Sequence, residues 1–431
     1  MIGGIVVRAF RFLHTADLHL NSPFVGISES LPSSLAQRVK QASDMVFDRV
    51  VQVAIDKEVD FLVLAGDAFD AATVSVRAQF ALIRGCERLL ERGIAVFLAH
   101  GNHDPLTASD GHFELPSNVH VFPALSAKHA RLSGSCNVKW RPDAHTNVQL
   151  SGFSYGSGDM AVNAAPLFHR ETDVDYAIGL YHGTVGNGDK HAPYYPTTTS
   201  DLSARDFDIW CLGHIHKPNI LHPQNPLILY AGCPQGRDAG EADERGCYVI
   251  DVDERGHATP QFVSTSDVVW RNVYIDVTGL RSMSDLRECM RNTIHSRIGT
   301  LEPTLLRISL HGSSNVLSAM DEKSMTEAFR DELALSFVNL YLLQVDIRVT
   351  PILDLQVLCE SEGYLGECLR IVEDWESKGM NDSAAYMPLL QSLTSQVSTL
   401  SQEDIIGATW LDFIAEVRQQ ILQLVQQEVA K

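Results

Sequence analysis

Five short apolar runs in the first half of the chain each end directly in a polar motif that contains Asp, Asn or His. The runs have the length of β-strands, and a helical pattern at 76–92 separates the runs at 61–65 and 94–99. Strand, helix and strand at this spacing predict a layered α/β unit. Because open α/β sheets bind ligands at the carboxyl ends of their strands, the motifs are expected to share one site. They are Asp17-x-His19, Gly66-Asp67, Gly101-Asn102-His103-Asp104, His182-Gly183 and Gly213-His214-Ile215-His216.

The motifs offer more nitrogen and oxygen ligands than the roughly four to six that one metal ion takes. Two metal ions about 3.5–4 Å apart that share a carboxylate fit the number better, and Asp67 is the natural bridge. Ligation by His, Asp and Asn without thiolates favours manganese, iron or zinc over calcium or a structural zinc. A single D-x-H or H-x-H pair would be a weak signal, whereas five motifs in order are a strong one. The candidate ligands are Asp17, His19, Asp67, Asn102, His182, His214 and His216.

The ordered series D-x-H, GD, GNHD, H-G and GH-x-H resembles that of the calcineurin-like metallophosphoesterases. The sequence at 12–20, 212–218 and 232–237 is most similar to the DNA-repair exonuclease branch, the SbcD type and especially the YhaO-like proteins. The resemblance implies an α/β fold, a layered metallophosphoesterase β-sandwich flanked by helices. It also implies a small α+β capping domain and a helical C-terminal region.

The resemblance assigns a role to each motif. His103 matches the histidine that acts on the phosphate without binding metal. Two cations neutralise the oxygens of a phosphodiester and activate a water, and the leaving oxygen then needs a proton that an imidazole can supply. Asp104 would either orient that imidazole or cap the turn. By the same resemblance, one ion would be held by Asp17, His19, Asp67 and His216, and the other by Asp67, Asn102, His182 and His214.

One position departs from the pattern of this branch. A histidine often follows its second motif as Gly-Asp-x-Phe-His, whereas here the last residue of that run is Asp70. An ionised Asp70 cannot donate a proton, so it would contact a metal-bound water or cap the next helix. Four other histidines near the motifs are expected to be ordinary packed or surface residues, namely His14, His100, His112 and His120.

Strand and helix patterns alternate as β-α-β-α-β between 269 and 349, and helical patterns follow. We therefore expect a nuclease domain at 9–265, a capping domain at 266–350 and a helical partner-docking region at 352–431. The last region carries an apolar stripe at helical spacing. The resemblance implies that this region docks on an SMC-like ATPase of the SbcC type; the alternatives are a self-packed helical subdomain or a homodimer contact. The stripe consists of Trp410, Ile414, Val417, Ile421 and Leu424.

The charge balance limits how the chain can meet a polyanion. It has 34 basic and 54 acidic residues, a net charge of −20, whereas a protein that grips nucleic acid through its whole surface should be basic. DNA binding would therefore be local and assisted by metal ions or a partner. The loop at 186–199 could contribute, with Tyr194, Tyr195 and Lys190, unless it is an ordinary surface loop.

The sequence thus predicts a metal-dependent DNA phosphodiesterase, an exonuclease or endonuclease in a repair or defence complex, with two divalent ions and manganese preferred. One alternative is a small-substrate phosphatase or cyclic-nucleotide phosphodiesterase of the same superfamily. Another is a non-catalytic scaffold for an ATPase. Eight cysteines without a C-x-x-C pair favour reduced thiols and a cytoplasmic protein. No run approaches the roughly 20 apolar residues of a membrane span, and the first eleven residues lack the order of a signal peptide.

Overall fold

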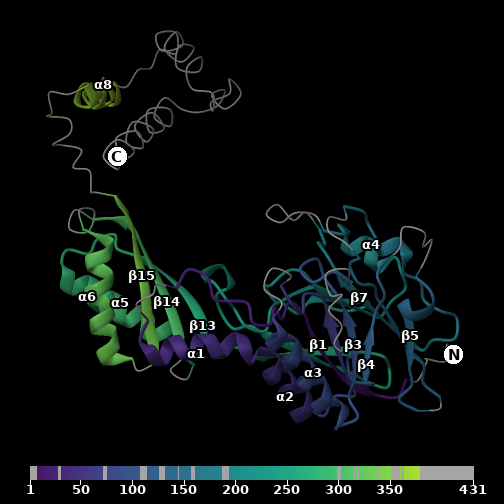
Figure 1. Cartoon of the computed structure of the whole chain (residues 1–431). Helices are drawn as coiled ribbons and strands as arrows, with labels where there is room; N and C mark the ends of the chain where they lie inside the picture. The colour runs from purple at the N-terminus through teal and green to yellow at the C-terminus, as the bar shows by residue number, and fades with distance from the viewer. Residues whose placement is uncertain are drawn as a thin grey trace. The chain divides into compact units, whose positions relative to one another are not determined.

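Figure 1 shows the computed structural model of the chain. The chain forms two compact units. The first comprises Met1–Asn272, Ile298–Arg307 and Arg330–Leu343, and the second comprises Val273–Arg297, Ile308–Phe329 and Gln344–Lys431. The domain limits expected from sequence stay predictions. The structure describes residues 7–27, 31–70, 75–106, 114–125, 132–143, 145–156, 161–186, 194–298, 302–314, 317, 320–337, 339–350, 360 and 364–378.

The first unit contains two six-stranded mixed sheets. In the first sheet, of order β12-β11-β1-β2-β3-β4, strands β1 to β4 run parallel and β11 is antiparallel to β1. Its strands are β1 (Phe10–Thr15), β2 (Phe61–Ala65), β3 (Ala95–Ala99), β4 (Val119–Val121), β11 (Gly246–Val252) and β12 (Ala258–Ser264). The helices between its parallel strands are α1 (Ser33–Asp44), α2 (Val46–Asp56) and α3 (Val76–Leu90).

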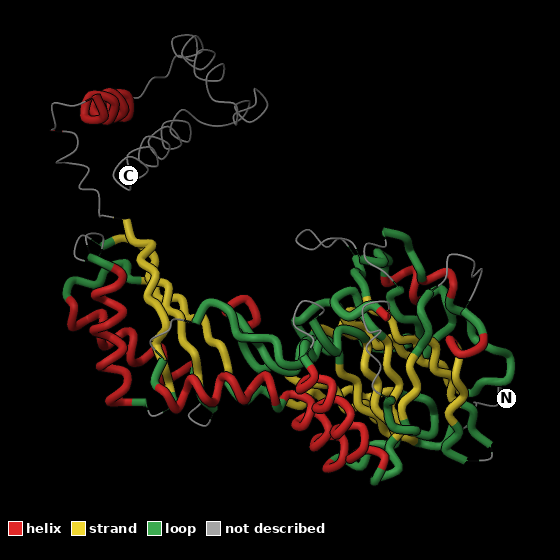
Figure 2. Tube along the Cα trace, viewed as in Figure 1, coloured by secondary structure: helices red, strands yellow, loops and turns green. Residues whose placement is uncertain are grey.

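The second sheet has the order β5-β6-β7-β8-β10-β9, in which β6, β7, β8 and β10 run parallel. Its strands are β5 (Asn137–Trp140), β6 (Val148–Ser151), β7 (Tyr176–His182), β8 (Ile209–Gly213), β9 (Asn219–His222) and β10 (Leu227–Tyr230). Short helical segments precede or connect these strands: η2 (Gly134–Cys136) comes before β5, η3 (Ala165–Leu167) lies between β6 and β7, and α4 (Thr199–Ser203) lies between β7 and β8. Figure 2 shows the strands of both sheets in yellow.

Side chains of β2 show how the layers form. All five of its residues are buried, so the strand faces a covered layer on each side. Phe61 and Val63 lie in the core that joins the two sheets, whereas Leu62 and Leu64 pack with buried residues of α2 and α3. The alternation follows from the two-residue period of a strand. The structure therefore confirms the predicted layered α/β fold with helices on the sheet.

The chain after β12 forms a three-stranded sheet of order β13-β14-β15. The alternation of strands and helices agrees with the β-α-β-α-β pattern of the sequence. The elements are β13 (Val269–Asp276), α5 (Met283–Arg297), β14 (Thr304–Ser313), α6 (Glu322–Ser336) and β15 (Leu340–Thr350). Helix α8 (Tyr364–Lys378) follows, and the apolar stripe from Trp410 to Leu424 lies outside the described residues. Among the described helices, none has the length and apolar character needed to cross a membrane.

His14 in β1 is fully buried, and neither ring nitrogen makes a hydrogen bond of good geometry with the described part of the chain. Burial lowers the pKa of His14 to about 3, against a smaller opposite effect of the Leu212 backbone. The unfolded chain takes up this proton near pH 6.5. The neutral His14 side chain therefore contributes to the free energy of unfolding above pH 6.5, and that contribution is lost as the pH falls from 6.5 toward 3.

We expect His14→Leu to weaken this acid sensitivity. Between pH 7 and pH 5 the free energy of unfolding should fall by about 2 kcal/mol less in the variant than in the original protein. Urea titrations at the two pH values measure the difference, with the exposed His145→Asn as the control. An unchanged pH dependence would show that His14 is protonated in the folded state.

Candidate metal centre

The structure brings all seven predicted ligands to one end of the two sheets of the first unit. Each follows or ends a strand: Asp17 and His19 follow β1, Asp67 follows β2, Asn102 follows β3, His182 ends β7, and His214 and His216 follow β8. Hydrogen bonds between the loops fix their register. The His214 N–H donates to the Asp17 carboxylate at 3.0 Å, and the His103 N–H donates to Asp67 Oδ1 at 2.9 Å.

One group of ligands surrounds His19. Its Nε2 lies 3.2 Å from Nε2 of His216 and 3.8 Å from Oδ2 of Asp67. Asp17, His19 and His216 each offer a ligand atom within 4.8 Å of the other two. Burial holds the pKa of His19 well below its usual value, so its imidazole is neutral and able to bind a cation.

A second group surrounds His182. Its Nδ1 donates to the Ala65 carbonyl at 2.9 Å, so in the neutral form of the ring Nε2 presents a lone pair to the interior of the site. That nitrogen lies 3.0 Å from Asn102 Oδ1 and 3.3 Å from Asp67 Oδ2. His214 Nδ1 approaches the same Asn102 oxygen at 3.1 Å. Lone pairs that converge in this way need a positive charge among them, because they otherwise repel one another.

The pKa shifts of Asp67 and His182 also indicate that the site needs a positive charge. Burial favours the neutral forms of both groups, but their mutual attraction outweighs it. The charge of Asp67 raises the pKa of His182 to about 9, and His182 lowers the pKa of Asp67. Asp67 Oδ2 is buried and makes no hydrogen bond of good geometry within the described chain. A proton on His182 or a bound cation satisfies this carboxylate, and the donor set therefore fits a metal ion.

Backbone conformation aims the ligands at the shared centre. Positive φ angles are uncommon for residues other than glycine and cost about 1–3 kcal/mol each. Four ligands adopt them, with values of 51° at Asp17, 42° at His19, 53° at Asp67 and 98° at His214. A side chain at Gly101 would lie only 2.2 Å from Asp67 Oδ1, so the third motif requires glycine for this close approach.

His103 lies at the exposed edge of the ligand cluster. Its ring packs edge-on against that of His19, with the ring centres 5.0 Å apart, and its side chain is 46% exposed. Its Nδ1 is 3.6 Å from Asp70 Oδ1. Asp70, whose role the sequence left uncertain, is therefore the carboxylate beside His103.

Asp104 occupies a different place from the one that an orienting carboxylate would need. It is buried, and its oxygens accept hydrogen bonds from the N–H groups of Ala68 and Gly101 at 2.9 and 2.7 Å. Its Oδ2 also lies 3.1 Å from His100 Nδ1. These contacts correspond to the turn-capping alternative, since Asp104 joins the loop after β2 to the loop after β3.

Two further side chains lie near the centre, of which Glu241 was not foreseen and Tyr194 belongs to the loop singled out from the sequence. Glu241 contacts His216 and comes from η4 (Ala239–Glu241), in a loop with no periodic pattern that could mark it. Tyr194 places its ring edge-on to His214 with centres 5.3 Å apart, whereas Tyr195 is fully buried. Lys190 of the same loop lies outside the described residues.

Comparison with known proteins identifies the family of the chain. Residues 10–218 match the family described as calcineurin-like phosphoesterase. The chain is 34% identical to the uncharacterized metallophosphoesterase YhaO of Bacillus subtilis, over 70% of this chain and 72% of that protein. It is 25% identical to the SbcD component of the SbcCD nuclease of the same species, over 59% and 70% of the two chains. It is 22% identical to the DNA double-strand break repair protein Mre11 of Methanopyrus kandleri, over 65% and 62%. The chain therefore belongs to the calcineurin-like phosphoesterases, a family of metal-binding hydrolases.

Proposed function

We propose that the protein is a metal-dependent phosphodiesterase that cleaves DNA, as the nuclease component of a repair or defence complex. The observation that supports it most is the convergence of the seven candidate ligands, with Asp67 Oδ2 lying 3.8 Å from His19 Nε2 and 3.3 Å from His182 Nε2. The names of two relatives, a nuclease component and a DNA repair protein, favour DNA as the substrate.

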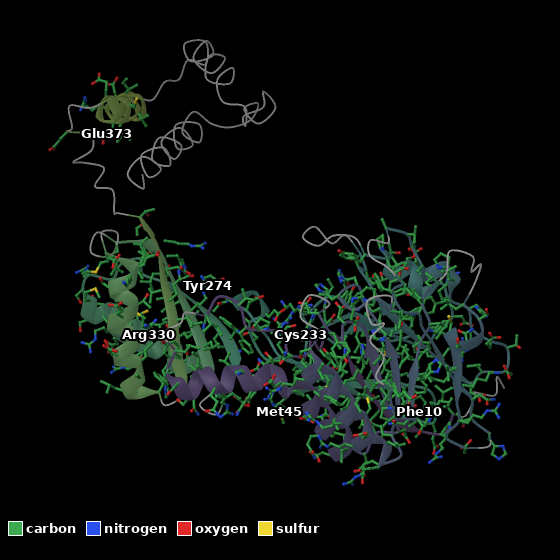
Figure 3. The ribbon with its side chains drawn as sticks, viewed as in Figure 1. Phe10, Met45, Cys233, Tyr274, Arg330 and Glu373 are labelled. Atoms are coloured by element: carbon green, nitrogen blue, oxygen red, sulfur yellow. The ribbon has the colours of Figure 1, made fainter. Side chains whose placement is uncertain are left out.

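Each ligand group would hold one divalent ion, and manganese suits a set of carboxylate, amide and imidazole ligands. The buried Cys233, labelled in Figure 3, does not alter this set, because burial raises the pKa of its thiol well above the usual range. The ions would neutralise the phosphate oxygens and activate water. His103 would hold a proton for the leaving oxygen, with Asp70 beside its other ring nitrogen. Its exposure leaves the ring accessible to a polymeric substrate.

A manganese-dependent assay on two substrates tests this proposal. We expect the protein to cleave end-labelled DNA and a small phosphodiester such as bis(4-nitrophenyl) phosphate. Hydrolysis confined to a phosphomonoester or a cyclic nucleotide would favour the second candidate function, which the net charge of −20 supports. No hydrolysis by protein that contains both ions would favour a scaffold.

The net charge of the chain also indicates what kind of partner protein it would need. Coulomb repulsion acts against every DNA phosphate outside the metal centre of a chain at −20. Extensive DNA cleavage would therefore need a second protein with a basic surface, and an SMC-like ATPase of the SbcC type is the partner that we propose. A self-packed helical subdomain or a homodimer contact is the alternative use of the apolar stripe.

Deleting residues 409–431 should abolish association with that ATPase and leave hydrolysis of the small phosphodiester unchanged. An amphipathic helix binds a partner through apolar anchors at this spacing, so removing the anchors removes the contact. Pull-down with the ATPase and an activity assay measure the two effects. The double variant Gln419→Ala and Gln420→Ala, on polar positions of the same segment, is the control. Aggregation or metal loss in the truncated protein would show that the stripe is core.

A further inference from the structure

We propose that Glu241 is a positioning residue that fixes the ring orientation and tautomer of His216 and so sets the affinity of one metal position. The inference rests on the proposed metal-dependent function and concerns the ion near Asp17, His19 and His216. The ion near Asn102 and His182 should not depend on Glu241.

The contact between the two side chains defines which ring nitrogen faces the site. Glu241 Oε1 lies 2.5 Å from His216 Nδ1, and the Glu241 side chain is only 11% exposed. An ionised carboxylate only accepts hydrogen bonds, so Nδ1 must carry the hydrogen. In the neutral form of the ring, the lone pair of His216 is thereby left on Nε2, the nitrogen that lies 3.2 Å from Nε2 of His19. Carboxylates that hold a ligating histidine in this way commonly tune metal sites.

Independent contacts hold the carboxylate in place. Its Oε2 accepts the Arg237 N–H at 2.7 Å, and the Arg237 guanidinium approaches Oε1 at 3.4 Å. These contacts fix the orientation of the carboxylate through Arg237, which is not one of the candidate metal ligands.

A purely structural role for the carboxylate would duplicate contacts that Arg245 already makes. The buried Arg245 guanidinium donates to the carbonyl of His216 at 2.6 Å and to the carbonyl of Glu241 at 3.1 Å. The main chains of the two residues are therefore joined without the carboxylate. Burying a charge is costly, so its position against His216 points to a function other than holding the loop.

Direct metal binding by Glu241 is the main alternative, since Glu241, Cys233 and His216 offer ligand atoms within 4.8 Å of one another. Two observations argue against it. The Arg237 N–H occupies Oε2, and the contact with His216 Nδ1 occupies Oε1. The Arg237 guanidinium beside the carboxylate would also repel a cation.

Glu241→Gln tests the proposal, because the side chain keeps its size and loses its charge. Calorimetric titration of the metal-free protein with manganese should show one of two sites weakened by roughly 10–100-fold, the usual effect of losing such a partner. The other site should keep its affinity, and Glu241→Asp should restore part of the loss. Glu244→Gln, at a half-exposed carboxylate of the same loop that pairs with Arg271, is the control.

Other outcomes would overturn the inference in distinct ways. Equal weakening of both sites, or a lower melting temperature of the metal-free variant with unchanged manganese affinity, would assign Glu241 a structural role. A comparable loss in Cys233→Ser would indicate a different metal site formed by Cys233 and Glu241. Because the titration measures binding alone, protein that binds manganese as expected but cleaves no DNA would contradict the proposed function and leave this inference standing.

Discussion

Asp67→Ala should abolish hydrolysis and release both metal ions while the fold survives. Oδ2 of Asp67 is the atom that the two ligand groups share, at 3.8 Å from His19 Nε2 and 3.3 Å from His182 Nε2. Its removal leaves each group without its bridging carboxylate. It also removes the main attraction that raises the pKa of His182, so the two groups lose affinity for any cation.

Elemental analysis after gel filtration measures the retained ions, and circular dichroism checks the fold. The alanine leaves the His103 N–H without its acceptor, which costs about 1–3 kcal/mol, so some loss of stability is expected. Asp251→Ala is a suitable control, because Asp251 is a half-exposed carboxylate of β11 that pairs with Arg11. Two ions still bound to Asp67→Ala would contradict the bridging assignment.

His103→Ala should retain both ions and lower turnover by roughly 10²–10⁴-fold, the usual scale for a general acid. Its side chain is about half exposed, and the hydrogen bond to Asp67 comes from the backbone, so the substitution should leave the loops of the candidate ligands intact. Turnover of the small phosphodiester at saturating manganese measures the loss.

A companion variant, Asp70→Asn, tests the contact with the ring. If the Asp70 carboxylate orients His103, turnover should fall by less than in His103→Ala, and the two substitutions together should cost no more than His103→Ala alone. Near-normal turnover of His103→Ala at full metal occupancy would refute the acid role. An additive effect in the double variant would separate Asp70 from His103.

The gathering of the seven candidate ligands could be predicted from the sequence because each residue ends an apolar strand or lies in the loop after one. Parallel strands bring their carboxyl ends to one edge, so local pattern alone places Asp17 and Asp67 together. Ligands of the second sheet were predictable for the same reason, since His182 ends β7 and His214 follows β8.

Other features depend on contacts between distant segments, which no local pattern records. The antiparallel pairing of β11 with β1 joins residues about 240 positions apart. Glu241 meets His216 only because η4 folds back over the loop after β8. The roles of Asp70 and Asp104 rest on side-chain direction, since both carboxylates are close to His103 or Asp67 in sequence and only one faces the His103 ring.

Anomalous scattering from crystals grown with manganese tests the metal centre most directly. Two peaks about 3.5–4 Å apart are expected, one among Asp17, His19, Asp67 and His216 and the other among Asp67, Asn102, His182 and His214. A single peak, or peaks at acidic residues away from these loops, would contradict the account.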